Sequence, residues 1–101
     1  MTDQEPVELP IEDALDLHSF EPRDIPSVVE EYLREARRRG LAEVRLIHGR
    51  GSGTQRAIVR ALLPRLPQVA FFTDAPPDRG GWGATIVGLK PQLDEKPTED
   101  G

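Results

Sequence analysis

Two histidines are the residues of this chain best suited to proton transfer at neutral pH. His18 ends a strand-like run that begins at Leu15, and His48 ends a second one that begins at Val44. An imidazole titrates near neutral pH, so either side chain can give or take a proton in the cell. The second histidine leads into a glycine-rich segment, residues 49–54, of the kind that seats a phosphate where it opens a helix. Together these features predict chemistry on, or binding of, a phosphate-bearing polymer.

Asp16 and His18 lie two residues apart on an expected strand, so both side chains point to one face of it. There the carboxylate can orient the imidazole, or both can hold a metal ion; the alternative is a solvated strand end that binds nothing. His48 is expected at the carboxyl end of a neighbouring strand, where ligands of open α/β sheets gather. The catalytic candidates are therefore Asp16, His18 and His48, with the histidines as general acid and general base.

The kind of nucleic acid decides how useful a metal would be. In RNA the substrate's own 2′-hydroxyl can attack the phosphorus, and this needs no metal. In DNA a water must be activated, and a Mg²⁺ or Mn²⁺ ion held by Asp16 becomes more attractive. The sequence assigns no metal ligands and no certain cofactor.

The segment after His48 is not a Walker A loop, because no Gly-Lys-Ser/Thr follows at the required spacing. It resembles the dinucleotide fingerprint G-x-G-x-x-G, but position 54 is threonine. We interpret it as a cradle in which backbone N–H groups and Arg50 bind one backbone phosphate; the alternative is that the glycines only permit a tight turn. The cradle residues are Gly49, Arg50, Gly51, Ser52 and Gly53.

A third glycine cluster, residues 80–85, contains the only tryptophan. Small neighbours cannot bury Trp82 locally, so we expect it to be exposed, and a base could stack on it. The alternative is that it covers the open end of the core. Gly83 and Thr85 join it as candidates for nucleic-acid binding.

The charge distribution favours a basic body between acidic ends. The net charge is −5, but residues 15–90 hold 12 Lys+Arg against nine Asp+Glu, and 11 of the 12 are arginines. Arginine is the better bidentate phosphate ligand, although arginine content can also reflect a GC-rich genome. Arg56, Arg60 and Arg65 are either a solvated helix face or, if aligned with Arg50, a phosphate track.

The elements that must position these residues are four strands and two helices. The strands are expected at residues 14–18, 43–48, 68–73 and 84–89. One helix runs from an Asp24 cap to Gly40, and the other runs from a Ser52 or Thr54 cap to Pro64. This order predicts a two-layer α/β sandwich, β-α-β-α-β-β, with a mixed four-stranded sheet and both helices on one face. An active site on so small a domain should be a surface cleft.

Composition bounds the domain and its surroundings. Residues 1–13 are an acidic N-terminal arm and residues 91–101 an acidic tail, both expected to be flexible, around a domain at 14–90. The chain has no cysteine, which removes disulfides and thiolate chemistry. Its apolar runs are too short to cross a membrane, and its N-terminus is not a signal peptide. A cytoplasmic monomer is expected.

Three spaced blocks resemble the Smr (small MutS-related) domain family. That family carries Leu-Asp-x-His-Gly, His-Gly-x-Gly and Gly-x-Gly-x-Thr blocks, which residues 15–18, 48–51 and 81–85 match. The resemblance covers about residues 15–89, as a stand-alone member without the ATPase and clamp domains of MutS-like proteins. Ser19 stands where the family's first block ends in glycine, so it could narrow the site or contribute a hydroxyl.

The resemblance implies a fold like the C-terminal domain of translation initiation factor three. It also implies nucleic-acid cleavage, since some members nick DNA and others cut RNA, including messenger RNA on stalled ribosomes. Carried over by residue, it makes Asp16 and His18 catalytic. It also implies an active-site loop and an adjoining wall, formed by His48, Gly49, Gly51, Gly81, Gly83 and Thr85.

We therefore expect an endonuclease that acts on nucleic acid, with RNA favoured over DNA as the substrate. His18 would be the principal acid or base, held by Asp16. His48 would be its partner or the phosphate stabiliser, and Arg50 would neutralise the scissile phosphate. One alternative is a non-catalytic module that binds nucleic acid or the ribosome. Another is an adaptor that docks a protein partner through the helical face or Trp82.

Overall fold

The structure, a computed structural model, describes residues 13–91, and these form the predicted order β-α-β-α-β-β. The strands and α-helices are β1 (Ala14–Asp16), α1 (Ile25–Arg38), β2 (Glu43–Ile47), α2 (Thr54–Leu62), β3 (Val69–Asp74) and β4 (Ala84–Leu89). The flexible arms predicted at residues 1–13 and 91–101 lie outside the described residues, apart from Asp13 and Pro91, and their flexibility stays a prediction.

The sheet is mixed, as predicted, with the strand order β1-β2-β4-β3. β1 and β2 are parallel, whereas β4 is antiparallel to both β2 and β3. The carboxyl ends of β1, β2 and β3 therefore meet at one edge, beside the start of β4. In register, Asp16 lies opposite Ile47, Ile47 opposite Ala84, and Asp74 opposite Thr85. We call this the site edge, because every candidate block of the sequence ends or begins there.

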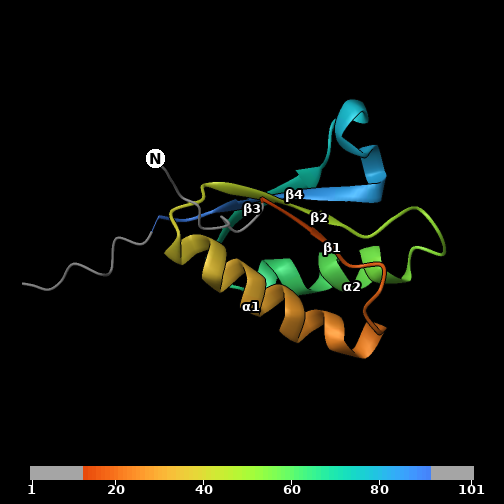
Figure 1. Ribbon diagram of the computed structural model, residues 1–101, viewed down its shortest axis with the longest axis horizontal. Coiled ribbons are helices and arrows are strands. Elements are labelled where there is room, and N and C mark those ends of the chain that lie inside the picture. The colour runs from red at the N-terminus through yellow and green to blue at the C-terminus, as the bar shows by residue number, and fades with distance from the viewer. Residues whose placement is uncertain (1–12, 92–101) are drawn as a thin grey trace, which may run out of the picture.

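Both helices cover one face of the sheet, which confirms the two-layer sandwich (Figure 1). The apolar spacing predicted for α1 buries four of its side chains completely: Ile25, Val29, Leu33 and Ala36. They pack against sheet residues such as Leu46 and Val87 and against Val59 of α2. Burial of these apolar side chains, at roughly 1.5–3 kcal/mol for each large one, is the main force that holds the helices on the sheet.

Several predicted boundaries are wrong by one or two residues, for local reasons. The first strand ends at Asp16 rather than His18, because a turn closes when the Phe20 N–H donates to the Leu17 carbonyl at 3.0 Å. The predicted Ser52 or Thr54 cap of α2 is also wrong. The N-cap is Gly53, whose φ of 85° lies in the left-handed region, and no side chain caps the helix. Glycine adopts that conformation without the clash of a Cβ atom.

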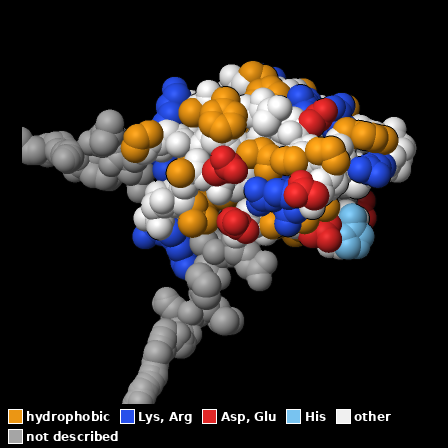
Figure 2. Space-filling view, turned by 90° about the horizontal axis from the view of Figure 1, so that it is seen from above, with side chains coloured by type: hydrophobic (Ala, Val, Ile, Leu, Met, Phe, Trp, Pro, Cys, Tyr) orange, Lys and Arg blue, Asp and Glu red, His pale blue; other side chains and the backbone are white. Residues whose placement is uncertain are grey.

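The other face of the sheet carries the β3–β4 connection, which rises from it in Figure 1. Beneath the connection, Ala75, Ala84 and Ile86 form a second, small buried cluster. Phe71 lies 51 % exposed on this side, against Gly88. Figure 2, seen from above, shows hydrophobic and charged side chains interspersed. Within residues 13–91, neither α-helix is long and apolar enough to cross a membrane.

Candidate functional site

Asp16 and His18 form a hydrogen-bonded pair where β1 ends. The Oδ1 atom of Asp16 lies 2.7 Å from His18 Nδ1 and accepts the His18 backbone N–H at 3.0 Å. Because a carboxylate oxygen only accepts, Nδ1 carries the proton and Nε2 is left as the open ring nitrogen. The backbone N–H of His18, and then its ring, hold the pKa of Asp16 below its usual value. The pair is therefore an oriented imidazole with an ionised partner.

The imidazole of this pair is accessible to a ligand, since the His18 side chain is 75 % exposed. Figure 2 shows histidine surface at one end of the molecule beside acidic side chains. Leu17, between the two residues, is fully buried in the core. The alternation of β1 continues one residue past its end, because the Leu17 N–H donates to the Ile47 carbonyl at 2.8 Å, so Leu17 points inward while Asp16 and His18 lie outside.

His48 is, in contrast, almost completely buried at 6 % exposure. Its Nδ1 lies 3.2 Å from the Gly49 carbonyl oxygen, and its Nε2 lies 2.8 Å from the Thr85 hydroxyl. The carbonyl can only accept, so Nδ1 donates and Nε2 accepts from the Thr85 hydroxyl. Burial, aided by the positive charges of Arg56 and Arg60, lowers the pKa of His48. The ring is therefore neutral at pH 7 and joins the loop after β2 to β4.

The glycine loop between β2 and α2 is fixed at its start and open at its end. The N–H groups of His48 and Gly49 both donate to the Gly83 carbonyl, at 3.1 and 2.8 Å. The predicted cradle therefore cannot use the N–H of Gly49. The N–H groups of residues 51–53 have no acceptor within the part of the chain that the structure describes. They lie just before the N-terminus of α2, where the helix dipole favours an anion.

A surface cavity of about 430 Å³ joins these two segments. It is lined by His18, Pro22, His48, Gly49, Gly51, Ser52, Gly53, Thr54 and Gln55. The Asp-x-His turn thus faces the glycine loop and the first turn of α2 across one cleft. The predicted meeting of His18 with the loop is what the structure shows, and the cleft has room for a phosphate and part of its sugar.

Arg50 and Trp82 do not line this cavity but lie together beside the glycine cluster that precedes β4. The Arg50 guanidinium donates to the Gly80 carbonyl at 3.1 Å, and its Cζ lies 5.9 Å from the centre of the Trp82 ring. Trp82 is 45 % exposed and belongs to neither buried cluster of the described residues. The exposed fraction agrees with the predicted exposure of Trp82.

Two of the three arginines considered for a phosphate track, Arg56 and Arg60, bind the same carboxylate. Asp74, the last residue of β3, accepts a hydrogen bond from Arg56 at 2.9 Å and another from Arg60. The bond from Arg56 is the main cause that lowers the pKa of Asp74. Arg56 also lies 5.9 Å from the Trp82 ring, so it joins Arg50 there. Arg65 lies apart, beside the cavity between the helices with Pro26 and Leu62.

Sequence reasoning missed three residues of this edge. Gln55 lines the cavity and donates from its side-chain nitrogen to the Phe20 carbonyl at 3.2 Å, which ties α2 to the turn after β1. Pro22 lines the same cavity, and Asp74 pairs with the arginines. Only Asp74 left a signal in the sequence, since it follows an apolar strand that ends at the same edge as His18 and His48.

The described residues do not form a multidentate metal-binding site at this edge. Across residues 13–91, no three His, Cys, Asp or Glu side chains are close enough to hold a metal ion together. Asp16 is the carboxylate nearest to His18, and its Oδ1 is already engaged. Mg²⁺ prefers oxygen ligands in an octahedral shell, so here it would take most of them from water and substrate. That donor set fits a loosely held ion better than a resident one.

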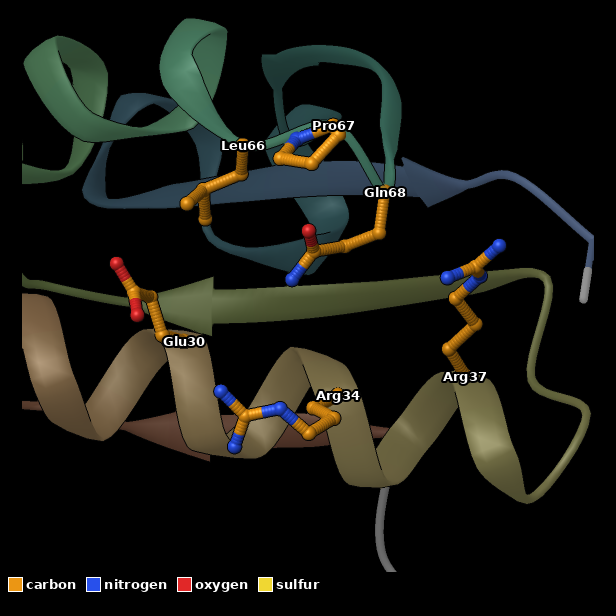
Figure 3. Close-up of a pocket in the computed structure, with 6 residues that line it drawn as sticks. All are labelled: Glu30, Arg34, Arg37, Leu66, Pro67 and Gln68. Carbon is orange, nitrogen blue, oxygen red and sulfur yellow. The ribbon is translucent and has the colours of Figure 1, made fainter.

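A second hollow, of about 340 Å³, lies away from the site edge, between α1 and the start of β3 (Figure 3). The close-up shows Glu30, Arg34 and Arg37 projecting from α1 towards Pro67 and Gln68. Its arginines are already engaged. Arg34 pairs with Glu31, and Arg37 donates to the carbonyls of Lys90 and Pro91. No imidazole lines this hollow, whereas two histidines line the cavity at the site edge.

A model of the Smr domain matches residues 15–90 of this chain. Among curated proteins, "Endonuclease MutS2" of Thermus thermophilus is 48 % identical over 63 residues, covering 62 % of this chain and 8 % of that protein. "Endonuclease MutS2" of Solidesulfovibrio magneticus is 42 % identical over 76 residues, covering 75 % of this chain and 10 % of that protein. The chain thus spans about a tenth of the length of these relatives.

Two solved structures share the fold. The Smr domain of Thermus thermophilus MutS2 superposes with a TM-score of 0.74 at 41 % identity, covering 77 % of this chain and 98 % of that one. YdaL of Escherichia coli, a stand-alone small MutS-related protein, also gives a TM-score of 0.74, at 28 % identity, with 80 % and 66 % covered. The likeness therefore holds both for a domain cut from a large protein and for a separate small one.

Proposed function

The chain belongs to the Smr domain family, and we propose that it is a nucleic-acid endonuclease that works through Asp16 and His18. The observation that carries the proposal is the exposed His18 ring, whose Nδ1 is held by Asp16 and whose Nε2 is open beside the glycine-loop cavity. Relatives that carry the word endonuclease in their names support it. A base with a fixed tautomer beside an anion seat is the arrangement that phosphodiester cleavage needs.

In the proposed reaction the scissile phosphate binds at the N–H groups of residues 51–53 and the N-terminus of α2. These donors stabilise the negative charge that grows on the phosphoryl oxygens. His18 Nε2 removes the proton from the attacking hydroxyl, and Asp16 stabilises the imidazolium that forms. The new oxygen–phosphorus bond replaces the bond to the 5′-oxygen, which leaves with a proton from solvent.

RNA is the proposed substrate, because its 2′-hydroxyl is a nucleophile that a single exposed base can activate. Cleavage then yields a 2′,3′-cyclic phosphate and a 5′-hydroxyl. His48, which is buried with both ring nitrogens engaged, acts in this scheme by holding the loop rather than by moving a proton. Arg50 donates to the Gly80 carbonyl and does not line the cavity that His18 lines, so it would neutralise a neighbouring phosphate rather than the scissile one. We further propose a cytoplasmic monomer, with RNA on the ribosome as one setting.

A second candidate function is a module that binds nucleic acid, or the ribosome, without cutting. Two observations favour it: Ser19 replaces the glycine of the family block, and His48 is not placed to serve as the second proton-transfer group. Such a module would keep the anion seat and the basic residues. Its binding would weaken steeply with salt, because each neutralised phosphate releases counterions.

Incubation of the purified protein with end-labelled single-stranded RNA and matched DNA separates the two functions. The reactions run with and without EDTA, beside an Asp16→Ala/His18→Ala double variant. The endonuclease proposal expects RNA fragments that the double variant does not produce, and EDTA resistance would support metal-free transesterification. Retained binding without fragments would select the binding module, and Ser19→Gly would be the next variant to assay.

A further inference from the structure

Trp82 is presented at the site edge between two arginines that come from different elements. The ring sits in the short turn Gly81–Gly83 before β4. Arg50 reaches it from the glycine loop and Arg56 from the first turn of α2, and each guanidinium carbon lies 5.9 Å from the ring centre. With almost half of its surface open to solvent, the ring is available to a ligand as well as to the cations.

The surrounding contacts hold this group in one arrangement. A Cβ atom at Gly81 would come 2.7 Å from the Arg50 guanidinium, and one at Gly83 would come 3.0 Å from the Arg50 Cγ. Arg50 therefore lies flat across the two glycines and is fixed at its end by the Gly80 carbonyl, at 3.1 Å. Arg56 is fixed by Asp74 at 2.9 Å. The lack of a side chain at Gly81 and Gly83 thus makes room for Arg50 against the backbone on either side of Trp82.

This group adjoins the proposed cleavage cavity through one backbone contact. The Gly83 carbonyl, directly after Trp82, accepts the N–H groups of His48 and Gly49. Both of these residues line the cavity that His18 faces. The nucleotide adjacent to a phosphate held in that cavity is thus the one that would reach Trp82 and its arginines.

We propose that Trp82, with Arg50 and Arg56, is a stacking platform for an unpaired nucleobase, so that this site takes single-stranded nucleic acid. The inference rests on the proposed function and narrows its substrate class. Every base offers a face on which an aromatic ring can stack, and the two guanidinium groups attract the adjacent phosphates. In a duplex both faces of a base are already covered by its neighbours, so paired nucleotides cannot use the platform.

Because Trp82 is the only tryptophan, its fluorescence reports on the platform directly. The test uses the full chain carrying His18→Ala, so that RNA stays intact, and titrates it with a single-stranded oligonucleotide, its duplex and an abasic strand of equal length. The proposal expects saturable quenching by the single strand only. Stacking is worth about 1–3 kcal/mol per base, so Trp82→Ala should weaken binding of a dye-labelled single strand by roughly 5- to 150-fold. Trp82→Phe should keep most of the affinity.

Phe71→Ala is the matched control, since it removes the other large exposed aromatic side chain and should leave affinity unchanged. Equal quenching by duplex and single strand, or full affinity in Trp82→Ala, would overturn the platform. Quenching without cleavage by the wild type would uphold the platform while removing the endonuclease. No quenching by any oligonucleotide would overturn the platform and leave the surface to a protein partner.

Discussion

The hydrogen bond between Thr85 and His48 gives a stability prediction that can be worked from the structure. Thr85 is fully buried, and its hydroxyl is the donor to His48 Nε2 at 2.8 Å. Thr85→Val keeps the shape of the side chain but leaves that buried nitrogen without a partner. An unsatisfied buried polar group costs about 1–3 kcal/mol. The methyl that replaces the hydroxyl recovers up to about 0.8 kcal/mol, so we expect a net loss between about 0.2 and 3 kcal/mol, centred near 1–2 kcal/mol.

The assay is urea or thermal unfolding of the wild type, Thr85→Val and a control, Thr73→Val. Thr73 is an exposed threonine of β3, so its hydroxyl contacts water, and replacing it leaves no buried polar group without a partner. For a domain of this size each kcal/mol shifts Tm by about 4–8 °C. The account therefore expects a Tm lower by several degrees for Thr85→Val and little change for Thr73→Val. Equal Tm values for the two variants would refute the assigned hydrogen bond and, with it, the role of His48 as the anchor of the loop.

Two further predictions concern the same loop. Gly49→Ala should lower the free energy of unfolding by about 1–2 kcal/mol, because the φ of Gly49, 82°, lies in the left-handed region. The matched control is Gly51→Ala, which lies outside that region, is equally uncrowded and should be neutral or slightly stabilising. Equal unfolding free energies for the two variants would show that backbone strain at Gly49 is not the cause. Burial holds the folded pKa of His48 below its unfolded value near 6.5, so the unfolded chain binds the proton first and stability falls as pH drops below about 6.5. Unfolding measured from pH 7.5 to 5 should show this loss in His18→Ala but not in His48→Gln; its persistence in His48→Gln would contradict the assignment.

The fold was predictable because local signals agree along this chain. Buried positions recur at helical spacing in α1, and β4, Ala84–Leu89, has the predicted bounds around its β-branched run at residues 85–87. The strand order was not predictable. That β4 lies between β2 and β3 follows from side-chain packing across the sheet, and a connection made by a loop rather than a helix leaves that choice open.

The site likewise contains some contacts that were predictable from the sequence and others that depend on the strand order. The Asp-x-His pair and its cleft with the glycine loop follow from alternation and from the shared edge of strand ends, which are short-range rules. The bond between His48 and Thr85 joins residues 37 apart and exists only because β4 lies next to β2. The pairing of Asp74 with Arg56 and Arg60 likewise needs the end of β3 beside α2. Sequence spacing carries no information about such contacts, so it predicted His48 as a general acid or base, whereas the ring is buried with both nitrogens hydrogen-bonded.

Chemical rescue of His18→Ala tests the central claim most directly. The side chain is exposed, so free imidazole from solution can enter the space that the substitution leaves. With saturating single-stranded RNA, the account predicts that the cleavage rate falls about a hundredfold or more while RNA affinity is kept. It predicts that added imidazole restores part of the rate and does not accelerate the wild type. A cleavage rate that is unchanged in His18→Ala would contradict the account and remove His18 from the mechanism.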